Sequence, residues 1–249
     1  STVMDNDINF KVAGEASNGI SFTGDFNFNS AANHAANAAG GNSDGSHSLT
    51  ISGPFGSVDL GDTNSAIDSI NGTTEVSPVL ELGTAGDDAA ISWTLPTLVD
   101  GLTVYVSHSA ETNHDGNAEA DGVAVKYSFG DLTVGYGQED NGAGTSESLI
   151  NATYKISGIY VAYEQHTTDN SGVDTDITNI GLSYSLDAVT LGYATSEKKV
   201  ASAAATYDKT TMSVAYNLGG GLQVFAATQS DDIAGSASDI TAVGAALKF

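Results

Sequence analysis

The side chains with the clearest chemical potential are carboxylates, gathered in one long segment between two stretches of alternating apolar residues. This segment, residues 62–88, has no Lys, Arg or His, and its acids are Asp62, Asp68, Glu75, Glu81, Asp87 and Asp88. Rings of acidic side chains favour cations where they line a pathway. Clustered carboxylates also suit Ca²⁺, which takes roughly six to eight oxygen ligands. Asp87–Asp88 and Asp231–Asp232 are therefore candidate calcium sites, although neither matches the spacing of an EF-hand loop.

Groups that could support catalysis are scattered along the chain. No HExxH or other zinc spacing occurs among the five histidines, which are His34, His47, His108, His114 and His166. Ser107 and Ser109 flank His108, but a Ser-rich sequence produces such neighbours by chance. The GxSxG motif at residues 41–45 lies in a polar segment that leads into a strand, whereas a nucleophile elbow runs from a strand into a helix. The sequence therefore predicts no enzyme and no resident cofactor.

The charge balance is strongly acidic. Acidic residues number 31 against seven lysines, with no arginine, which gives a formal net charge of −24. Nucleic acid and anionic surfaces are disfavoured as partners, because phosphate contacts need Lys and Arg. Two explanations remain open from charge alone: a solvated acidic surface, or acidic loops on the extracellular face of a membrane protein.

Alternation of apolar residues with small or polar ones dominates the chain and predicts an all-β fold. No run of about eighteen apolar residues occurs, so a transmembrane helix is excluded. A transmembrane barrel is compatible with the mean hydropathy of −0.08, because alternation averages to neutral. Fifteen strands are predicted in a single domain spanning 1–249, near 7–14, 19–28, 47–53, 57–62, 89–95, 101–109, 122–129, 131–138, 148–156, 159–166, 177–185, 188–196, 209–217, 221–228 and 239–249.

The connections between these strands alternate in length. Long ones are predicted at 29–46, 63–88, 110–121, 139–147, 167–176, 197–208 and 229–238, with short turns between them. Short turns on one rim and long loops on the other are typical of outer-membrane barrels, whereas a soluble sandwich has no reason to sort its loops this way. Eight tyrosines fall mostly in strands, many near strand ends, which fits an interfacial aromatic girdle or simply β-propensity.

The number of strands has a consequence for closure. Fifteen antiparallel strands cannot close into a barrel, because the first and last would meet in parallel. One further strand before Ser1, running in the opposite direction, would allow the barrel to close. Ser1–Asn6 is too short to supply it, because a spanning strand needs roughly 9–11 residues. We therefore predict a 16-stranded barrel whose first strand is missing from this chain or is supplied otherwise. The alternative is 14 strands, with 57–62 and 209–217 as the weakest predictions.

The carboxy terminus resembles the assembly signal of bacterial outer-membrane proteins, because Val243, Ala245, Leu247 and the terminal Phe249 share one face. Two further stretches, 49–62 and 216–222, resemble hairpins of the alphaproteobacterial, Rhodobacter-type general porins, and residues 8–22 look like that family's second and third strands. The resemblance spans the chain in order. It implies a 16-stranded homotrimeric barrel in the outer membrane of a Gram-negative bacterium, among lipid and lipopolysaccharide, that passes small hydrophilic solutes.

The resemblance also implies where the pore narrows. Porins of this family fold their third extracellular loop into the barrel, and the matching segment here is the acidic stretch 62–88. The family sets a cluster of Arg and Lys against this loop, but this chain has no Arg. Alternation points Lys11, Lys126 and Lys155 inward, so these are the candidates for a diluted basic wall. Each could instead be a lone inward lysine without a role, an alternative we favour slightly for Lys155.

Three hypotheses follow from the sequence. The first is a diffusion porin that favours cations. The second is a surface adhesin built as a soluble, acidic β-sandwich. The third is an outer-membrane barrel with a plugged lumen and a structural or partner-binding role. The barrel rests on alternation, loop lengths and the terminal phenylalanine, whereas the porin function also depends on the resemblance.

Overall fold

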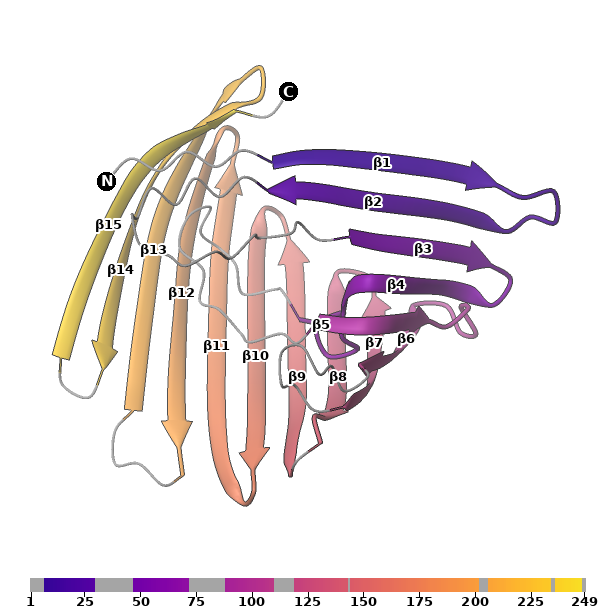
Figure 1. The fold of residues 1–249 in the computed structure, drawn as a ribbon. Coiled ribbons are helices and arrows are strands. Elements are labelled where there is room, and N and C mark those ends of the chain that lie inside the picture. Colours follow the sequence, from indigo (N-terminus) through magenta and orange to yellow (C-terminus); the bar gives the residue numbers. More distant parts are fainter. Residues whose placement is uncertain are drawn as a thin grey trace, which may run out of the picture.

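A computed structural model describes residues 7–29, 47–71, 88–109, 119–142, 144–201, 206–233 and 236–247. These residues form one antiparallel sheet in which every strand pairs with its neighbours in sequence (Figure 1). The strands are β1 (Asp7–Glu15), β2 (Ser21–Asn29), β3 (His47–Gly53), β4 (Gly56–Asn64), β5 (Asp88–Thr94), β6 (Leu102–Ser109), β7 (Ala120–Phe129), β8 (Leu132–Asp140), β9 (Thr145–Ile156), β10 (Ile159–Asn170), β11 (Val173–Leu186), β12 (Val189–Val200), β13 (Thr206–Gly219), β14 (Leu222–Ile233) and β15 (Ser236–Leu247).

All fifteen predicted strands are present, and the two weakest predictions are confirmed as β4 and β13. Four predicted long connections are wrong, because β8 to β15 continue beyond the expected ends. The segment 167–176, for example, forms a tight turn at Ser171–Gly172, and pairing continues up to Asn170 and Val173. Both turn residues have positive φ, 53° and 88°, as a two-residue hairpin of type I′ requires. These strand ends are polar on both faces, so hydrophobic alternation does not mark them.

The pattern of burial on the two faces of the sheet is the reverse of that in a soluble protein. Large apolar side chains such as Val125, Ile150 and Leu182 are exposed on one face, which we call the outer face. The opposite, inner face carries small and polar side chains, and there Asn179 and Ala194 are buried. A sandwich buries its apolar faces between two sheets. A single sheet with its apolar face outward is the arrangement of a barrel that meets lipid, so the adhesin hypothesis is not supported.

Aromatic side chains mark one boundary of the apolar band. Tyr127, Tyr154, Tyr184 and Tyr216 lie on the outer face of alternate strands, near the short-turn ends, and all four are exposed. Tyrosine has an apolar ring and a polar tip, so such a row suits a membrane interface. Tyr105 lies on the inner face, so not every strand tyrosine belongs to this row.

The sheet curls along the later strands and is not closed: β1 and β15 are its two edges (Figure 1). These edge strands run in the same direction, because each of the fourteen pairings between them is antiparallel. Strands β1 to β6 have seven to nine residues, whereas β9 to β15 have twelve to fourteen. In the described part of the chain, no helix has the length and apolar character needed to cross a membrane.

Candidate functional site

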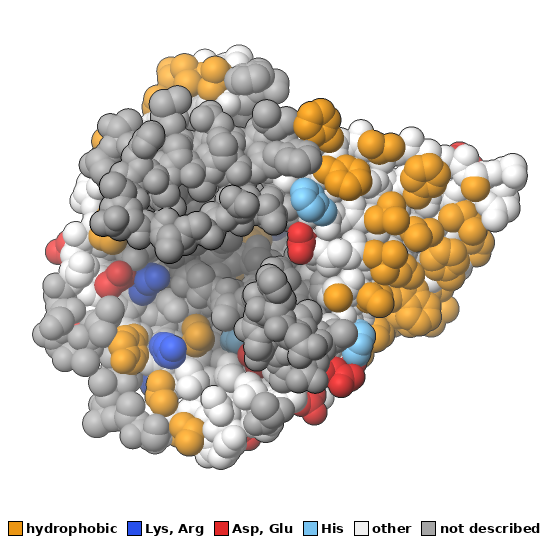
Figure 2. Space-filling model, viewed as in Figure 1, with side chains coloured by type: hydrophobic (Ala, Val, Ile, Leu, Met, Phe, Trp, Pro, Cys, Tyr) orange, Lys and Arg blue, Asp and Glu red, His pale blue; other side chains and the backbone are white. Residues whose placement is uncertain are grey.

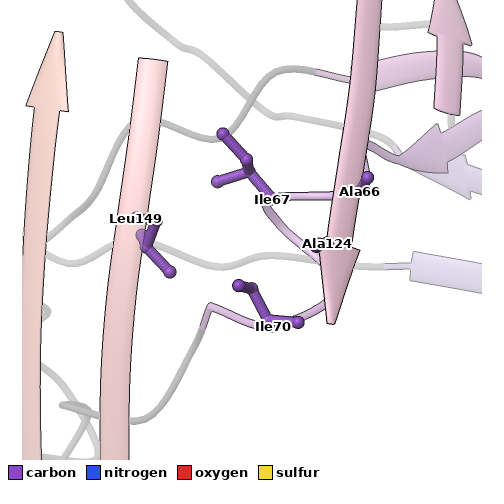
Figure 3. Packing of buried hydrophobic residues seen from close by; sticks show 5 residues of the cluster. All are labelled: Ala66, Ile67, Ile70, Ala124 and Leu149. Carbon is purple, nitrogen blue, oxygen red and sulfur yellow. The ribbon is translucent and has the colours of Figure 1, made fainter. Parts of the chain in front are cut away.

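A short turn after β4 lies against the inner face of the sheet. Its backbone bonds follow a helical pattern: Ser69 N–H donates to the Ser65 carbonyl at 3.0 Å, and Ile70 N–H donates to the Ile67 carbonyl at 3.1 Å. The side chains of Ala66, Ile67 and Ile70 are almost completely buried. They pack with inner-face residues Ala124 of β7 and Leu149 of β9, and Figure 3 shows the two isoleucines between these strands. We call residues 65–71 the inserted turn.

Glycines on the inner face of β7 and β8, which we call part of the wall, make room for the inserted turn. A Cβ atom on Gly137 would lie 3.1 Å from Ile67 Cγ1 and 3.2 Å from Ile70 Cδ1, closer than side chains normally pack. A Cβ on Gly135 would lie 3.3 Å from Ile70 Cβ, and one on Gly122 would lie 3.2 Å from Ala66 Cβ. The inner face of β7 and β8 therefore lacks side chains at the positions where the inserted turn approaches most closely.

Two polar contacts fix the turn at its ends. Ala66 N–H donates to Ser107 Oγ of β6 at 2.8 Å, in a buried position. The Asn151 side-chain amide of β9 donates to the Ile70 carbonyl, also buried. Because an unsatisfied buried polar group is costly, these bonds hold the turn in one position across β6 to β9. The inserted turn thus narrows the space in front of the inner face.

The predicted acidic segment is only partly described. The connection between β4 and β5 is shorter than the predicted segment 62–88, because Asn64 of β4 still pairs with Asp88 of β5. Asp68 lies half-buried on the inserted turn. Asp62 Oδ2 accepts a bond from the His47 backbone N–H at 2.8 Å, and it lines a polar cavity of about 250 Å³ with Asp59 and Ser69 of the turn. The remaining predicted acids, Glu75, Glu81 and Asp87, and the side chain of Asp88 lie outside the described residues.

The three predicted lysines lie on the inner face, each with a partner. Lys11 Nζ forms an ion pair with Asp25 Oδ2 at 2.9 Å. Lys126 and Lys155 each lie over an inner-face tyrosine ring, with Nζ 5.1 Å from the centre of Tyr105 and 5.3 Å from that of Tyr160. Such cation–π contacts hold an ammonium group in place without neutralising it. All three lie on the inner face, as alternation predicts, but they are not one cluster, because they lie on β1, β7 and β9, and their role as a basic wall stays a prediction.

Residues 1–248 match the family profile described as "Gram-negative porin". The chain belongs to this family. It is an outer-membrane diffusion porin, and the exposed apolar band of its outer face is the surface that meets the membrane. No curated protein sequence matches this porin.

Solved porin structures share its fold. A porin refined at 1.8 Å resolution is 19% identical, with a TM-score of 0.77 over 98% of this chain and 92% of that one. An anion-selective porin from Comamonas acidovorans is 17% identical, with a TM-score of 0.75 over 100% and 91%. A mutant of the Rh. blastica porin is 17% identical, with a TM-score of 0.73 over 98% and 90%. At this level of identity the similarity shows the fold alone. Ion preference depends on the charged side chains on the inner face of this porin.

A group of inner-face carboxylates beside the inserted turn was not predicted from the sequence. Glu139, Glu147 and Glu164 lie on the inner faces of β8, β9 and β10, and Glu164 is completely buried. Glu147 Oε2 lies 2.8 Å from Nε2 of the buried His166, and the Asn179 amide donates to Glu164 Oε1 at 3.1 Å. The alternation of inner-face and outer-face residues continues through these positions. Glu139 and Glu147, however, fall in the predicted loop 139–147.

Two further inward lysines were not predicted: Lys198 falls in the predicted loop 197–208, and Lys209 is the first residue of the predicted strand 209–217. Lys198 and Lys209 continue the inner-face alternation set by the buried Ala194 and Thr211 on β12 and β13. Figure 2 shows lysine side chains gathered in the hollowed part of the molecule, on the side of these later strands. This porin therefore has more inward cations than the predicted set.

Residues of the predicted assembly signal lie together. Val243, Ala245 and Leu247 are on the outer face of β15, exposed, while Phe249 lies outside the described residues. The paired acids Asp231 and Asp232 lie on opposite faces of β14, as consecutive strand residues do, so their carboxylates do not converge. Asp231 Oδ2 instead accepts a bond from Gln229 Nε2 at 3.1 Å.

Proposed function

We propose that this porin is a general diffusion pore for small hydrophilic solutes, narrowed by the acidic loop after β4, and that it favours cations. The observation that carries the proposal is the inserted turn, which is seated on wall glycines and bonded at both ends. The sequence of the same loop supplies carboxylates and no cation. Solutes pass by diffusion, without chemistry.

The wall beside the turn supports the cation preference. Strands β8 to β10 carry Glu139, Glu147 and Glu164 on their inner faces, and their one lysine, Lys155, lies near the short-turn end. Asp25 neutralises Lys11. Acidic side chains therefore outnumber inward lysines at the level of the inserted turn, while Lys198 and Lys209 lie on β12 and β13.

Reversal potentials test the charge preference. We expect the wild-type porin, in a planar bilayer under a KCl gradient, to give a potential of cation-selective sign. In water, a carboxylate about 4 Å from a cation contributes about 1 kcal/mol of attraction, roughly a five-fold factor in ion occupancy. The double variant Asp59→Asn and Asp68→Asn should therefore lower the cation-to-anion permeability ratio severalfold.

The matched control for this experiment is Asp100→Asn, which removes an exposed charge from a short turn outside the wall and should leave the ratio unchanged. An anion-selective wild type, or equal effects of the double variant and of Asp100→Asn, would contradict the cation preference. Absence of any conductance steps would overturn the diffusion pore itself and favour a plugged, partner-binding barrel.

We also propose a homotrimer of the Rhodobacter type. Strands β1 to β4 are no longer than nine residues, at or below the roughly 9–11 that a lipid-facing strand needs. Their outer face is nevertheless apolar, with Phe10, Val12, Phe22 and Phe26 exposed, and Figure 2 shows this apolar surface on the side of the early strands. Contact with neighbouring copies would cover it. One similar structure, of OmpT from Vibrio cholerae, is described as a trimer form.

Mass measurement tests the trimer. Light scattering of the detergent-solubilised porin should give the mass of three chains. The variant Phe22→Lys places a charge on the proposed interface and should shift the mass toward one chain. Met212→Lys places the same charge on the outer face of β13, away from that interface, and serves as the control. A monomeric wild type would contradict the trimer.

The other proposed partners follow from the outer face and the loops. Outer-membrane lipid and lipopolysaccharide would contact the apolar band and its rim, and nucleic acid is not a partner of so acidic a chain. Calcium at Asp87–Asp88 remains a proposal based on sequence, since the Asp87 residue and the Asp88 side chain lie outside the described structure.

A further inference from the structure

Three potential metal ligands converge at the long-loop ends of β6 and β7. One ligand atom each from His108, Glu119 and Asp121 lies within 4.8 Å of the others. His108 Nδ1 lies 2.9 Å from Asp121 Oδ1. His108 is half-buried, while both acids are exposed, so the ring is supported by the sheet and the cluster can be reached from solvent.

The register of the sheet builds this cluster. His108 and Asp121 are direct partners in the β6–β7 ladder, and Glu119 immediately precedes β7. On the same outer face, the next residues toward the short turns are Val106 and Val123, both exposed and apolar. The cluster therefore lies just beyond the apolar band that meets the membrane, on the long-loop side, where water and dissolved ions have access.

We propose that His108, Glu119 and Asp121 bind a divalent transition-metal ion, with Zn²⁺ as the best fit. Zinc takes imidazole nitrogen and carboxylate oxygen, and sites with three protein ligands leave a position for water. The imidazole is the discriminating ligand, because Ca²⁺ and Mg²⁺ prefer sites made of oxygen alone. This site lies on the outer face, whereas the neighbouring residues Ser107 and Gly122 contact the inserted turn on the inner face, so the metal ligands themselves do not line the proposed pore.

Neighbouring carboxylates strengthen the attraction for cations without completing the site. Asp121 pairs with Asp140, and the same row continues across β9 through Ser146 to Asp169 and Asp174. These acids share the outer face, and among the described residues of β6 to β11 no lysine lies on it. They raise the local concentration of any cation. Only the end of the row at β6 adds a histidine, so selectivity for zinc should reside there.

Bound zinc would join the end of β6 to the start of β7. Because the ion binds only when both strand ends are in place, it stabilises the folded state increasingly as the free zinc concentration exceeds the dissociation constant. The site therefore predicts both a binding affinity and a zinc-dependent change in stability.

Zinc binding to the full chain, folded in detergent, tests the proposal by competition with a fluorescent zinc chelator. We expect one tight site, and His108→Ala should weaken it by roughly ten-fold or more, since even loss of an outer-shell partner costs about 10- to 100-fold at metal sites. Asp121→Asn should also weaken it. Asp140→Asn, in the same row, and His47→Ala, on β3, are the matched controls and should bind as the wild type does.

A second measurement is the thermal unfolding of the same samples. Zinc should raise the unfolding temperature of the wild type and of both controls, and at the same zinc concentration it should raise that of His108→Ala less. Equal zinc affinity in wild type and His108→Ala would overturn the site. So would a loss in Asp140→Asn as large as that in Asp121→Asn, or displacement of zinc by equimolar Ca²⁺, because either result would indicate a diffuse acidic surface only.

Discussion

Leu182→Arg is expected to destabilise the folded porin in a lipid bilayer by about 1–3 kcal/mol, less than the full cost of an arginine at the bilayer midplane, because Leu182 lies only two residues from the interfacial Tyr184. Leu182 is exposed on the outer face of β11, between Ile180 and Tyr184. It pairs with Val161 of β10 and Tyr193 of β12, so apolar side chains surround it on the sheet. Denaturant titration of folding into phosphatidylcholine vesicles measures the loss.

The neighbouring residue provides the control for this prediction. Ser183 follows Leu182 on the same strand but points to the inner face, which in a porin barrel lines the water-filled lumen. Ser183→Arg introduces the same side chain at the same depth and should cost much less. If both variants lost similar stability, or Ser183→Arg lost more, the assignment of the outer face to lipid would be wrong.

Gly137→Leu is expected to expel the inserted turn and widen the pore. Since a Cβ atom alone would approach Ile67 and Ile70 to 3.1–3.2 Å, a leucine side chain cannot share this space with them. Burial of Ile67 and Ile70 stabilises the docked turn by roughly 1.5–3 kcal/mol for each isoleucine. The clash with the leucine side chain must exceed this free energy to displace the turn. Single-channel conductance should rise as the turn leaves the wall.

Two further variants separate this effect from general bulk in the lumen. Ile70→Asp removes the apolar anchor and places a carboxylate in a buried site, so it should also undock the turn and raise conductance. Ala242→Leu adds a leucine to the inner face of β15, away from the turn, and should leave conductance equal or slightly lower. A lower conductance in Gly137→Leu, matching that of Ala242→Leu, would show that the turn does not limit the pore.

The sequence by itself determined the strands and their faces. Alternation is a local property, because consecutive strand residues point to opposite sides whatever the strand pairs with. Fifteen strands, the inward direction of Lys11, Lys126 and Lys155, and the shared face of Val243, Ala245 and Leu247 followed from it. The pattern failed where both faces are polar, so the ends of β8 to β15 were assigned to loops, and Lys198 and Glu147 were missed with them.

The tertiary structure alone decided what lies beside what. The seat of the inserted turn needs Gly135 and Gly137 of β8 in front of Ile70, although more than sixty residues separate them in the chain. The cluster of His108, Glu119 and Asp121 has no recognisable metal spacing in sequence, and the β6–β7 register brings it together. Cross-strand register and the path of a loop depend on contacts between distant segments. A pattern read along one strand does not contain them.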